Sequence, residues 1–393
     1  MRFFKSTAAL VTACLFLLCL LTLAACGGGI GGSGATPQGT MRVSVTDAPA
    51  CGYDEVNVTI TKVRVHQSTS AVDSDAGWSE ITLATPRRLD LLTLTNGALV
   101  ELGQTLLPAG KYTQLRLVLA ENTSAAPFAN SVIPTGGVET ALTTPSGSQT
   151  GIKINLDADV PADKIADVVL DFDACKSVVK RGASGKYNLK PVISATTALS
   201  DAGLRVIGYV TPSIAVASTS VSLQSAGVIV KATVPDADGR FVLYPVPVGT
   251  YDLVITSAGH VPTVLTGVPV TTTSFTTLNG AALPINPPAA ITLPVLGTVT
   301  PPTATVRALT TLTGGPTIET AWAPVDGTTG AFGFALPIEA PVKGSYAAGV
   351  APVFTADAAV AGKYTLEANS AGSLLTRAID VTAAVPVISF LFP

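Results

Sequence analysis

The sequence predicts an all-β protein composed of several small β-sandwich domains. Gly (36 residues) and Pro (28 residues) are abundant, and the apolar residues lean toward Val, Ala and Leu beside many Thr, which favours strands joined by tight turns. Apolar and polar residues also alternate in short segments, a pattern typical of half-buried strands. At 393 residues the chain exceeds one typical domain, so we expect two or three.

The first 25 residues have the pattern of an export signal. Arg2 and Lys5 give a positive start, an apolar run extends from about residue 8 to residue 23, and the small residues Ala24 and Ala25 follow. This order predicts a cleaved signal peptide over residues 1–25. The alternative is an uncleaved transmembrane helix, because the run approaches the roughly 20 apolar residues that cross a bilayer.

The segment Leu23-Ala24-Ala25-Cys26 favours cleavage, because it resembles the bacterial lipobox, in which the cysteine is acylated and the bond before it is cut. The resemblance implies a mature protein that begins at a lipidated Cys26. By similarity to bacterial sorting rules, Gly27 in place of Asp favours the outer membrane of a Gram-negative bacterium. Buried acyl methylenes contribute about 0.8 kcal/mol each to membrane affinity. Residues 26–40, rich in Gly, are expected to form a flexible tether.

The charge balance argues against nucleic-acid binding. The formal net charge of the whole chain is −3, and removal of Arg2 and Lys5 with the signal leaves −5 on the mature part. A surface that binds phosphates requires a basic excess, which this chain lacks. We therefore expect the membrane, reached through the lipid anchor, and a carbohydrate or an envelope protein as partners.

Two cysteines remain in the mature chain besides the lipidated one. Cys14 and Cys19 leave with the signal, so Cys51 and Cys175 are left. A pair of cysteines in an oxidising compartment predicts a disulfide, and closing so long a loop stabilises a domain by about 4 kcal/mol in the chain-entropy model. The alternative is two unrelated buried thiols.

A first domain is expected over residues 41–198. Its predicted strands contain residues 41–45, 56–60, 63–65, 78–83, 111–119, 151–156 and 168–172. Turn signals such as Asn96-Gly97 and Pro108-Ala109-Gly110 separate them. Residues 161–167 predict a short helix, because Ala, Asp and Lys stand there in place of β-branched residues.

Five segments of this domain have a recognisable order. They are MRVSVTDAPA (41–50), YDEVNVTITKVRVH (53–66), LPAGKYTQLRLVL (107–119), TPSGSQTGIKINL (144–156) and LDFDACKSVVKRGASGKYNLKPVI (170–193). Together they resemble the bacterial lipoprotein family called domain of unknown function 4382. The resemblance implies a β-rich fold and a place in the cell envelope, and it implies no activity.

A second domain is expected over residues 204–290. Val206-Ile207-Gly208 begins a strand, Asp238-Gly239 lies in a turn before Phe241, and Pro247-Val248-Gly249-Thr250-Tyr251 leads into another strand. This arrangement resembles the carboxypeptidase regulatory-like module, a small transthyretin-like or immunoglobulin-like β-sandwich. In such a sandwich the Asp-Gly pair supplies a hairpin turn, and Phe241 and Tyr251 face the core.

A third domain, residues 293–393, is expected to repeat the second with an interruption. The paired segments are 295–301 with 206–212, 330–332 with 239–241, and 361–364 with 248–251. The extra residues 339–360 fall between the repeated segments and predict a long hairpin or loop. The Pro-rich stretch 284–302 is expected to contain the boundary and to hold the two domains semi-rigidly apart.

Catalysis requires titratable groups gathered in a cleft, and the sequence is poor in them. His66 closes a predicted strand and His260 lies in another domain, so both are expected to be solvated or capping residues. The sequence contains neither the G-x-S-x-G elbow of many serine hydrolases nor the H-E-x-x-H motif of zinc hydrolases.

Carboxylates offer one candidate site in the first domain. Asp47 and Asp54 flank Cys51, and a disulfide to Cys175 would bring them near Asp173. Oxygen-rich clusters suit Ca²⁺, although the spacing is not that of an EF-hand. The alternative is that these residues start turns and keep strand edges soluble, and that the protein has no cofactor.

Two hypotheses about function follow. The first, which we favour, is a non-catalytic envelope lipoprotein whose β-domains have a binding or structural role toward a glycan or protein partner, because loops on rigid sandwiches commonly carry binding. The second is a metal-dependent or glycan-acting hydrolase that uses the Asp-rich first domain, although no pair of acids for glycoside cleavage is identified.

Overall fold

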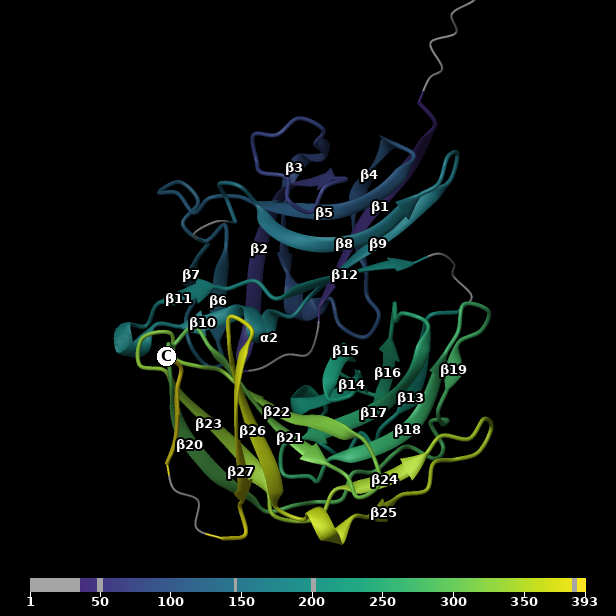
Figure 1. Ribbon diagram of the computed structural model, residues 1–393, viewed down its shortest axis with the longest axis vertical. Coiled ribbons are helices and arrows are strands. Elements are labelled where there is room, and N and C mark those ends of the chain that lie inside the picture. Colours follow the sequence, from purple (N-terminus) through teal and green to yellow (C-terminus); the bar gives the residue numbers. More distant parts are fainter. Residues whose placement is uncertain (1–35, 48–51, 145–146, 199–202, 384–386) are drawn as a thin grey trace, which may run out of the picture. The chain divides into compact units, whose positions relative to one another are not determined.

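The computed structural model describes residues 36–47, 52–144, 147–198, 203–383 and 387–393 (Figure 1). Nearly all regular structure there is strand, which confirms the all-β fold class. The signal peptide, Cys26 and most of the tether lie outside the described residues. Within the part of the chain that is described, no helix is long and apolar enough to cross a membrane.

The first sandwich consists of a four-stranded and an eight-stranded sheet. The smaller sheet has the order β12 (Ile193–Ala198), β9 (Ile165–Phe172), β1 (Gln38–Asp47), β4 (Val100–Pro108). The larger sheet has the order β10 (Val178–Lys180), β11 (Tyr187–Leu189), β7 (Thr140–Thr143), β6 (Ser131–Pro134), β2 (Tyr53–His66), β5 (Gly110–Leu119), β8 (Ile152–Val160), and β3 (Ser79–Asp90) pairs with β2. β1 pairs in parallel with β9 and antiparallel with β4.

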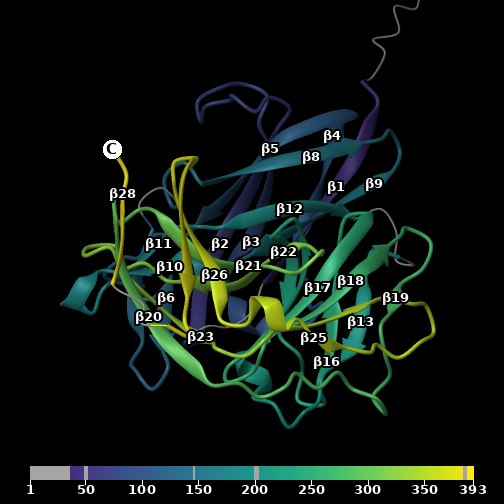
Figure 2. The same ribbon diagram turned by 60° about the horizontal axis from the view of Figure 1, so that its bottom comes forward.

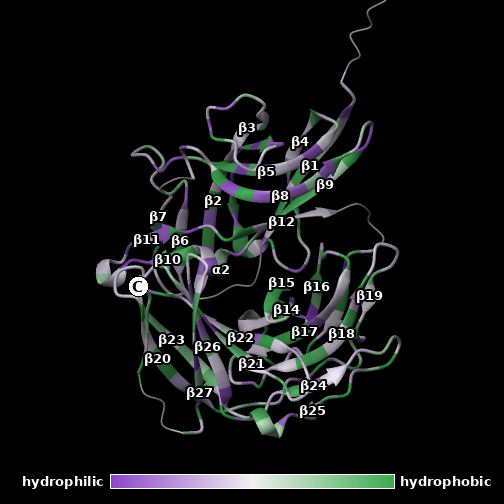
Figure 3. Ribbon diagram, in the orientation of Figure 1, coloured by the Kyte–Doolittle hydropathy of each residue, from purple (hydrophilic) through white to green (hydrophobic). Residues whose placement is uncertain are grey.

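Alternation along these strands builds the core, as the sequence predicted. In β8 every second side chain, from Ile152 to Val160, is buried and the intervening ones are exposed. Figure 3 shows such alternation as hydrophilic and hydrophobic bands along β8. Successive side chains of a strand point to opposite faces, so one face packs inward while the other meets solvent or a neighbouring segment.

The helix predicted at residues 161–167 is wrong. Residues 161–164 form a turn in which Asp163 has a φ of 59°, and β9 begins at Ile165. Four residues between two strands leave no room for a helix. The α-helix of the described residues is instead α2 (Ala174–Ser177), and single 3-10 turns occur at η1 (Leu91–Thr93), η2 (Gly182–Ser184), η3 (Val216–Ser218) and η4 (Ala358–Val360).

The second sandwich packs a three-stranded sheet against a six-stranded sheet. The three-stranded sheet has the order β16 (Arg240–Leu243), β13 (Val206–Tyr209), β19 (Thr276–Thr277). The six-stranded sheet has the order β15 (Val228–Thr233), β14 (Thr219–Ser225), β17 (Gly249–Ser257), β18 (Thr263–Val270), β24 (Val342–Ser345), β25 (Thr355–Ala356). Its core contains Phe241 and Tyr251, which confirms that these two side chains face inward.

The third sandwich repeats the second with fewer strands. Its sheets have the orders β23 (Ala331–Pro337), β20 (Thr292–Thr300), β28 (Ile388–Leu391), and β22 (Thr317–Ala323), β21 (Thr305–Thr311), β26 (Lys363–Ser370), β27 (Ser373–Asp380). Gly239 and Gly330 have φ angles of 76° and 70°, and a Cβ at either would overlap a backbone carbonyl oxygen. The predicted correspondence of residues 239–241 with 330–332 therefore has a shared steric cause.

One tyrosine hydrogen bond recurs in all three sandwiches. Tyr112 and Tyr251 donate their hydroxyls to the carbonyl oxygens of Pro108 and Pro247, four residues earlier, at 3.0 and 2.9 Å. In the third sandwich the donor is Tyr364 and the acceptor is the carbonyl oxygen of Pro337, 27 residues earlier, at 2.7 Å. We call this bond between a tyrosine hydroxyl and a proline carbonyl oxygen the tyrosine corner. It forms in the third sandwich even though the extra segment separates the proline from the tyrosine.

The extra residues 339–360 contain a hairpin, within the alternatives that the sequence left open. Its strand β24 leaves the third sandwich and pairs in parallel with β18 of the second, from Thr263–Val342 to Thr266–Ser345 (Figure 1). Strand β25, labelled in Figure 1 and again in Figure 2, pairs with β24. The expectation that the Pro-rich stretch holds these domains apart is wrong, because the two domains share one sheet. β20 occupies much of that stretch.

A small core and one buried carboxylate fix this hairpin. Val254 and Val264 of the second sandwich pack with Leu312 and Ile318 of the third. Asp357 accepts hydrogen bonds from the backbone N–H and the hydroxyl of Thr313 and from the ammonium of Lys343, all at 2.8 Å. Burial raises the pKa of Asp357, but the bonds from Lys343 and Thr313 outweigh burial and hold this pKa below its ordinary value.

We expect Asp357→Asn to lower the free energy of unfolding at pH 7 by about 1–3 kcal/mol, because the charged acceptor is lost. The lowered folded pKa means that the carboxylate stabilises the fold above the unfolded pKa of about 4 and loses this effect as the pH falls through the folded pKa. Urea unfolding of both proteins should therefore show a smaller difference near pH 3. Asp238→Asn, in an exposed turn, is the control, and a difference that does not change with pH would contradict the argument.

Candidate functional site

Two arginines lie opposite each other on the outer face of the eight-stranded sheet. Val63, Val65, Leu115 and Leu117 point into the core, so alternation turns Arg64 of β2 and Arg116 of β5 outward. The register pairs these two arginines directly, and it pairs Arg64 with Glu80 of β3. Like charges on opposite residues repel, so this face needs neighbouring negative or polar groups.

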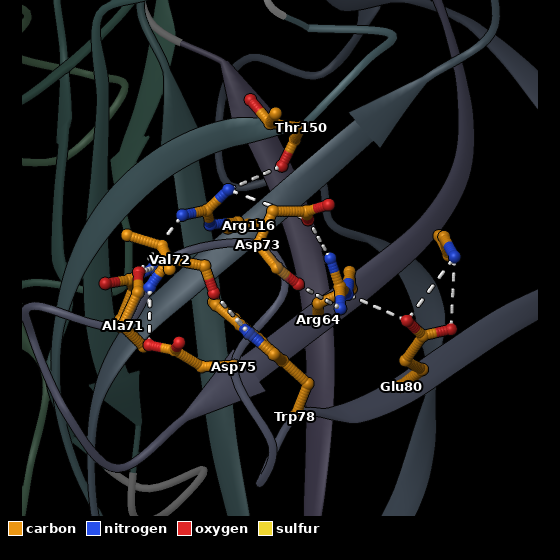
Figure 4. Close-up of polar contacts among 11 residues, drawn as sticks. Arg64, Ala71, Val72, Asp73, Asp75, Trp78, Glu80, Arg116 and Thr150 are labelled. Atoms are coloured by element: carbon orange, nitrogen blue, oxygen red, sulfur yellow. Dashed lines mark hydrogen bonds and ion pairs between the residues drawn. The ribbon is translucent and has the colours of Figure 1, made fainter.

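The loop between β2 and β3, residues 67–78, supplies those groups (Figure 4). Arg116, whose side chain is 9% exposed, donates to the carbonyl oxygens of Thr150 at 3.0 Å and Ala71 at 3.1 Å. Arg64 pairs with Asp73 of the loop, and its Nε lies 2.7 Å from a carboxylate oxygen of Glu80. Asp73 of the loop and Glu80 of β3 therefore balance the two arginine charges, and the bonds from the arginines hold the loop on the sheet.

Trp78 closes the arginine–tryptophan cluster, which consists of Arg64, Asp73, Trp78, Glu80 and Arg116. The ring centroid lies 4.7 Å from the guanidinium carbon of Arg64 and 5.0 Å from that of Arg116, within the range of cation–π attraction. The indole N–H donates to the carbonyl oxygen of Val72 at 3.0 Å, which binds the ring to the same loop (Figure 4). The middle of the loop, at Ala71 to Asp73, and its last residue, Trp78, are thus bonded to one another and to the two arginines.

His66 is a capping residue, in agreement with its predicted role. The N–H of Ser68 donates to Nδ1 at 2.9 Å, so the proton of a neutral ring lies on Nε2, which donates to the carbonyl oxygen of Ala76 at 3.0 Å. The ring lies 5.0 Å from that of Trp78. The cluster therefore fixes the loop on a rigid sheet. In this fixed loop the side chain of Val72 is 55% exposed to solvent.

The predicted Ca²⁺ ligands are not gathered by the fold. Asp47 accepts from the N–H of Ala174 at 2.9 Å, and Asp173 caps the same helix by accepting from the N–H of Lys176 at 2.9 Å. Asp54 instead accepts from the N–H of Gly136 in a separate turn. Among the residues that the structure describes, no group of three or more His, Cys, Asp or Glu side chains is placed to hold a metal ion. The expected cluster of Asp47, Asp54 and Asp173 is therefore not formed, because Asp54 is bonded to a different segment from the other two.

Two further aspartates of the first domain each pair with a basic side chain of a neighbouring strand. Asp157 pairs with Lys111 at 2.8 Å and Asp167 with Arg42 at 2.6 Å. Burial raises the pKa of Asp173, and the nearby Lys176 opposes that rise. Asp157 lies on the exposed face of β8 in the eight-stranded sheet and Asp167 lies on β9 in the four-stranded sheet, so these carboxylates are spread over two sheets.

Cys175 is disulfide-bonded. Cys51, its predicted partner, lies outside the described residues, so the pairing of these two stays a prediction. Cys175 lies in α2, and the first N–H group of this helix donates to Asp47. Asp47 precedes Cys51 by four positions, so the chain leading to Cys51 begins next to α2.

A set of charged residues where the sandwiches meet was missed by the sequence analysis. Lys231 lies 2.9 Å from Asp171, with side chains only 4% and 13% exposed. Lys176 and Arg307 lie 3.4 and 3.2 Å from the carboxylate of Glu319. The pairs Lys231–Asp171 and Lys176–Glu319 have no signal in the sequence, because each charge is a single residue in its element and its partner is far along the chain.

Residues 38–191 match the family described as Domain of unknown function (DUF4382), in agreement with the resemblance of the first domain. A comparison with curated proteins found no match. Two interface mutants of a type II cohesin–X-dockerin complex from Acetivibrio cellulolyticus share 26% and 27% identity over 23% of this chain and 60% of theirs, both with a TM-score of 0.19. A streptococcal ancillary pilin shares 11% identity over 90% of this chain and 98% of its own, with a TM-score of 0.14. These scores carry no argument about function.

We expect Trp78→Ala to release the loop at residues 67–78, because the variant loses two cation–π contacts and the bond to Val72, together about 1–3 kcal/mol. Amide hydrogen exchange of residues 67–77 should accelerate while that of β1 and β9 stays unchanged. Val72→Ser, at an exposed position of the same loop, is the matched control. Equal exchange in Trp78→Ala and the unmutated protein would show that the ring does not hold the loop.

Proposed function

We propose that this protein is a lipid-anchored lipoprotein of the cell envelope, in the outer membrane of a Gram-negative bacterium. Its three β-sandwiches act there as a rigid, non-catalytic frame with a binding or structural role toward a glycan or protein partner. The second and third sandwiches belong, in this proposal, to the carboxypeptidase regulatory-like modules. Their repeated glycine turn and tyrosine corner support that assignment.

The observation that carries the proposal is how firmly the sandwiches are joined. Asn96, at the turn of the first sandwich, donates its N–H to the hydroxyl of Thr233 at 2.7 Å and accepts from the N–H of Val242 at 2.6 Å. Gln224 of the second sandwich exchanges two hydrogen bonds with the backbone of Glu319 in the third, at 2.7 and 2.9 Å. These joints use buried polar groups, which are costly to separate because each would lose its partner.

The same joints use many of the charged side chains. The pairs Lys231–Asp171, Lys176–Glu319 and Arg307–Glu319 connect one sandwich to another or brace the surface that does so. Breaking a buried pair by removing one partner leaves an uncompensated charge, which costs about 3–5 kcal/mol. A frame of this kind favours presentation of loops and cavities over acid–base chemistry, which needs titratable groups free to exchange protons.

The anchor is tested by Cys26→Ser. We expect the full-length variant to leave the membrane fraction, because the acyl chains supply the membrane affinity. Cys19→Ser, inside the predicted signal, is the matched control and should remain with the membrane. Persistence of Cys26→Ser in washed outer membranes, measured by fractionation and immunoblotting, would contradict the lipid anchor.

The binding role is tested with the soluble Cys26→Ser protein on immobilised envelope polysaccharides, peptidoglycan and detergent-extracted envelope proteins. We expect saturable retention on at least one of these materials with no release of soluble sugar or peptide fragments. Release of sugar and peptide fragments is measured with reducing-sugar and amine assays on the supernatants. Steady release of fragments would favour the hydrolase and overturn the non-catalytic role.

A further inference from the structure

A cavity of about 320 Å³ lies between the second and third sandwiches. One wall comes from the end of β17 and the turn after it, with Thr256, Ser257 and His260. The opposite wall comes from β22 and β20, with Thr320, Trp322 and Thr292. We call it the seam cavity. Its volume lies at the small end of the range for ligand sites, about 300–1,000 Å³.

The walls of the seam cavity are fixed by backbone pairing. Ala290 donates to the carbonyl oxygen of Gly259 at 2.7 Å, and Val261 donates to that of Pro288 at 2.9 Å, so the chain that links the two sandwiches is bonded to the turn beside the cavity. The parallel pairing of β18 with β24 holds the two sandwiches in register. A site with preformed walls loses little conformational entropy when a ligand binds.

The lining of the seam cavity combines hydroxyl groups with apolar side chains and carries no carboxylate, ammonium or guanidinium group. Among its described lining residues the polar side chains are hydroxyls and one imidazole, with no Asp, Glu, Lys or Arg. A charged ligand would lose its hydration without gaining a counter-charge, which is unfavourable. The lining therefore selects a neutral ligand rich in hydrogen-bonding groups.

His260 supplies a directed acceptor. Its Nδ1 lies 2.9 Å from the carbonyl oxygen of Ala258, and because a carbonyl oxygen only accepts, Nδ1 carries the proton of the neutral ring. Nε2 is then an acceptor, with no hydrogen-bond partner within the described part of the chain. The hydroxyls of Thr256 and Thr292 likewise have no partner there, so donors and acceptors are both available to a ligand.

Trp322 supplies an apolar surface. It is half-buried in β22. Its neighbour Ala323 is part of the core of the third sandwich and Ala321 packs against that core, whereas Trp322 is not part of the core and lines the cavity instead. It also lines a cavity of about 190 Å³ beside the seam cavity, where Lys176 and Glu319 are already paired with each other. An indole beside hydroxyls suits a molecule with one apolar and one hydroxylated side.

We propose that the seam cavity binds a small neutral saccharide, of one or two sugar rings, that stacks its C–H face on Trp322 and donates a hydroxyl to Nε2 of His260. This proposal rests on the proposed binding function and names the ligand class and the site. Saccharides combine neutral charge, dense hydroxyls and an apolar ring face, which are the three properties of the lining.

The two tryptophans of the chain, Trp78 and Trp322, allow a direct test. In the soluble Cys26→Ser protein, Trp78→Phe leaves Trp322 as the single fluorescent tryptophan, and Trp322→Phe leaves Trp78 as the matched control. Both are titrated with maltose, cellobiose and diacetylchitobiose, and with glucuronic acid as a charged probe. We expect a saturable change with at least one neutral sugar in Trp78→Phe, no change in Trp322→Phe, and none with glucuronic acid.

Calorimetry in the same protein measures affinity without relying on fluorescence. We expect Trp322→Ala and His260→Ala each to weaken sugar binding about tenfold or more, and Val228→Ser, at an exposed position of the second sandwich, to leave it unchanged. Sugar binding that survives both alanine variants would overturn the site while leaving the proposed binding function intact. No saturable change with any neutral sugar up to about 10 mM would overturn the saccharide proposal, whereas retention on envelope proteins alone would still support the broader function.

Discussion

The parallel pairing of β24 with β18 is the constraint on which the arrangement of the second and third sandwiches depends. The segment that supplies β24 interrupts the third tyrosine corner between Pro337 and Gly362, yet Tyr364 still reaches the carbonyl oxygen of Pro337. The third sandwich therefore closes in the same way as the second while lending a strand to it. Backbone groups in a ladder cannot part without leaving donors and acceptors unpaired, so this joint resists opening more than contacts between side chains would. The seam cavity lies beside that joint, because Pro262, one of its lining residues, accepts a hydrogen bond from the N–H of Val342 in β24.

Buried charges and amides reinforce the joints between neighbouring sandwiches and give these joints specificity. Lys231 and Asp171 are almost fully covered, and a buried ion pair contributes little net stability because desolvation offsets the attraction. Removing one partner is nevertheless costly, so such a pair disfavours any packing in which the two residues do not meet. The reciprocal bonds between Gln224 and the backbone of Glu319 have the same effect, because an unpaired buried amide is expensive.

The arginine–tryptophan cluster and the seam cavity show two different uses of polar residues on β-sheet faces. In the cluster, Arg116 donates to the carbonyl oxygens of Ala71 and Thr150 and Trp78 donates to that of Val72, so the cluster organises a surface and leaves little bonding capacity for a ligand. In the seam cavity, Nε2 of His260 has no partner among the described residues, so bonding capacity remains. This contrast, more than the number of polar groups, separates a structural cluster from a binding site.

The sequence by itself determined the all-β class, the positions of the main strands and the repeat that relates the second and third sandwiches, because alternation and turn residues act locally. It also located the core residues Phe241 and Tyr251. Only the tertiary structure decided that residues 339–360 add strands to a neighbouring sandwich, that Asp54 lies away from Asp47 and Asp173, and that Glu319 meets Lys176. These outcomes depend on which strand edges and charges meet over long separations, such as 79 residues between Thr263 and Val342 and 143 between Lys176 and Glu319, and local periodicity contains no information about such partners. Trp322 and His260 illustrate the same limit, since each is an isolated residue in the sequence and only folding places both beside one cavity.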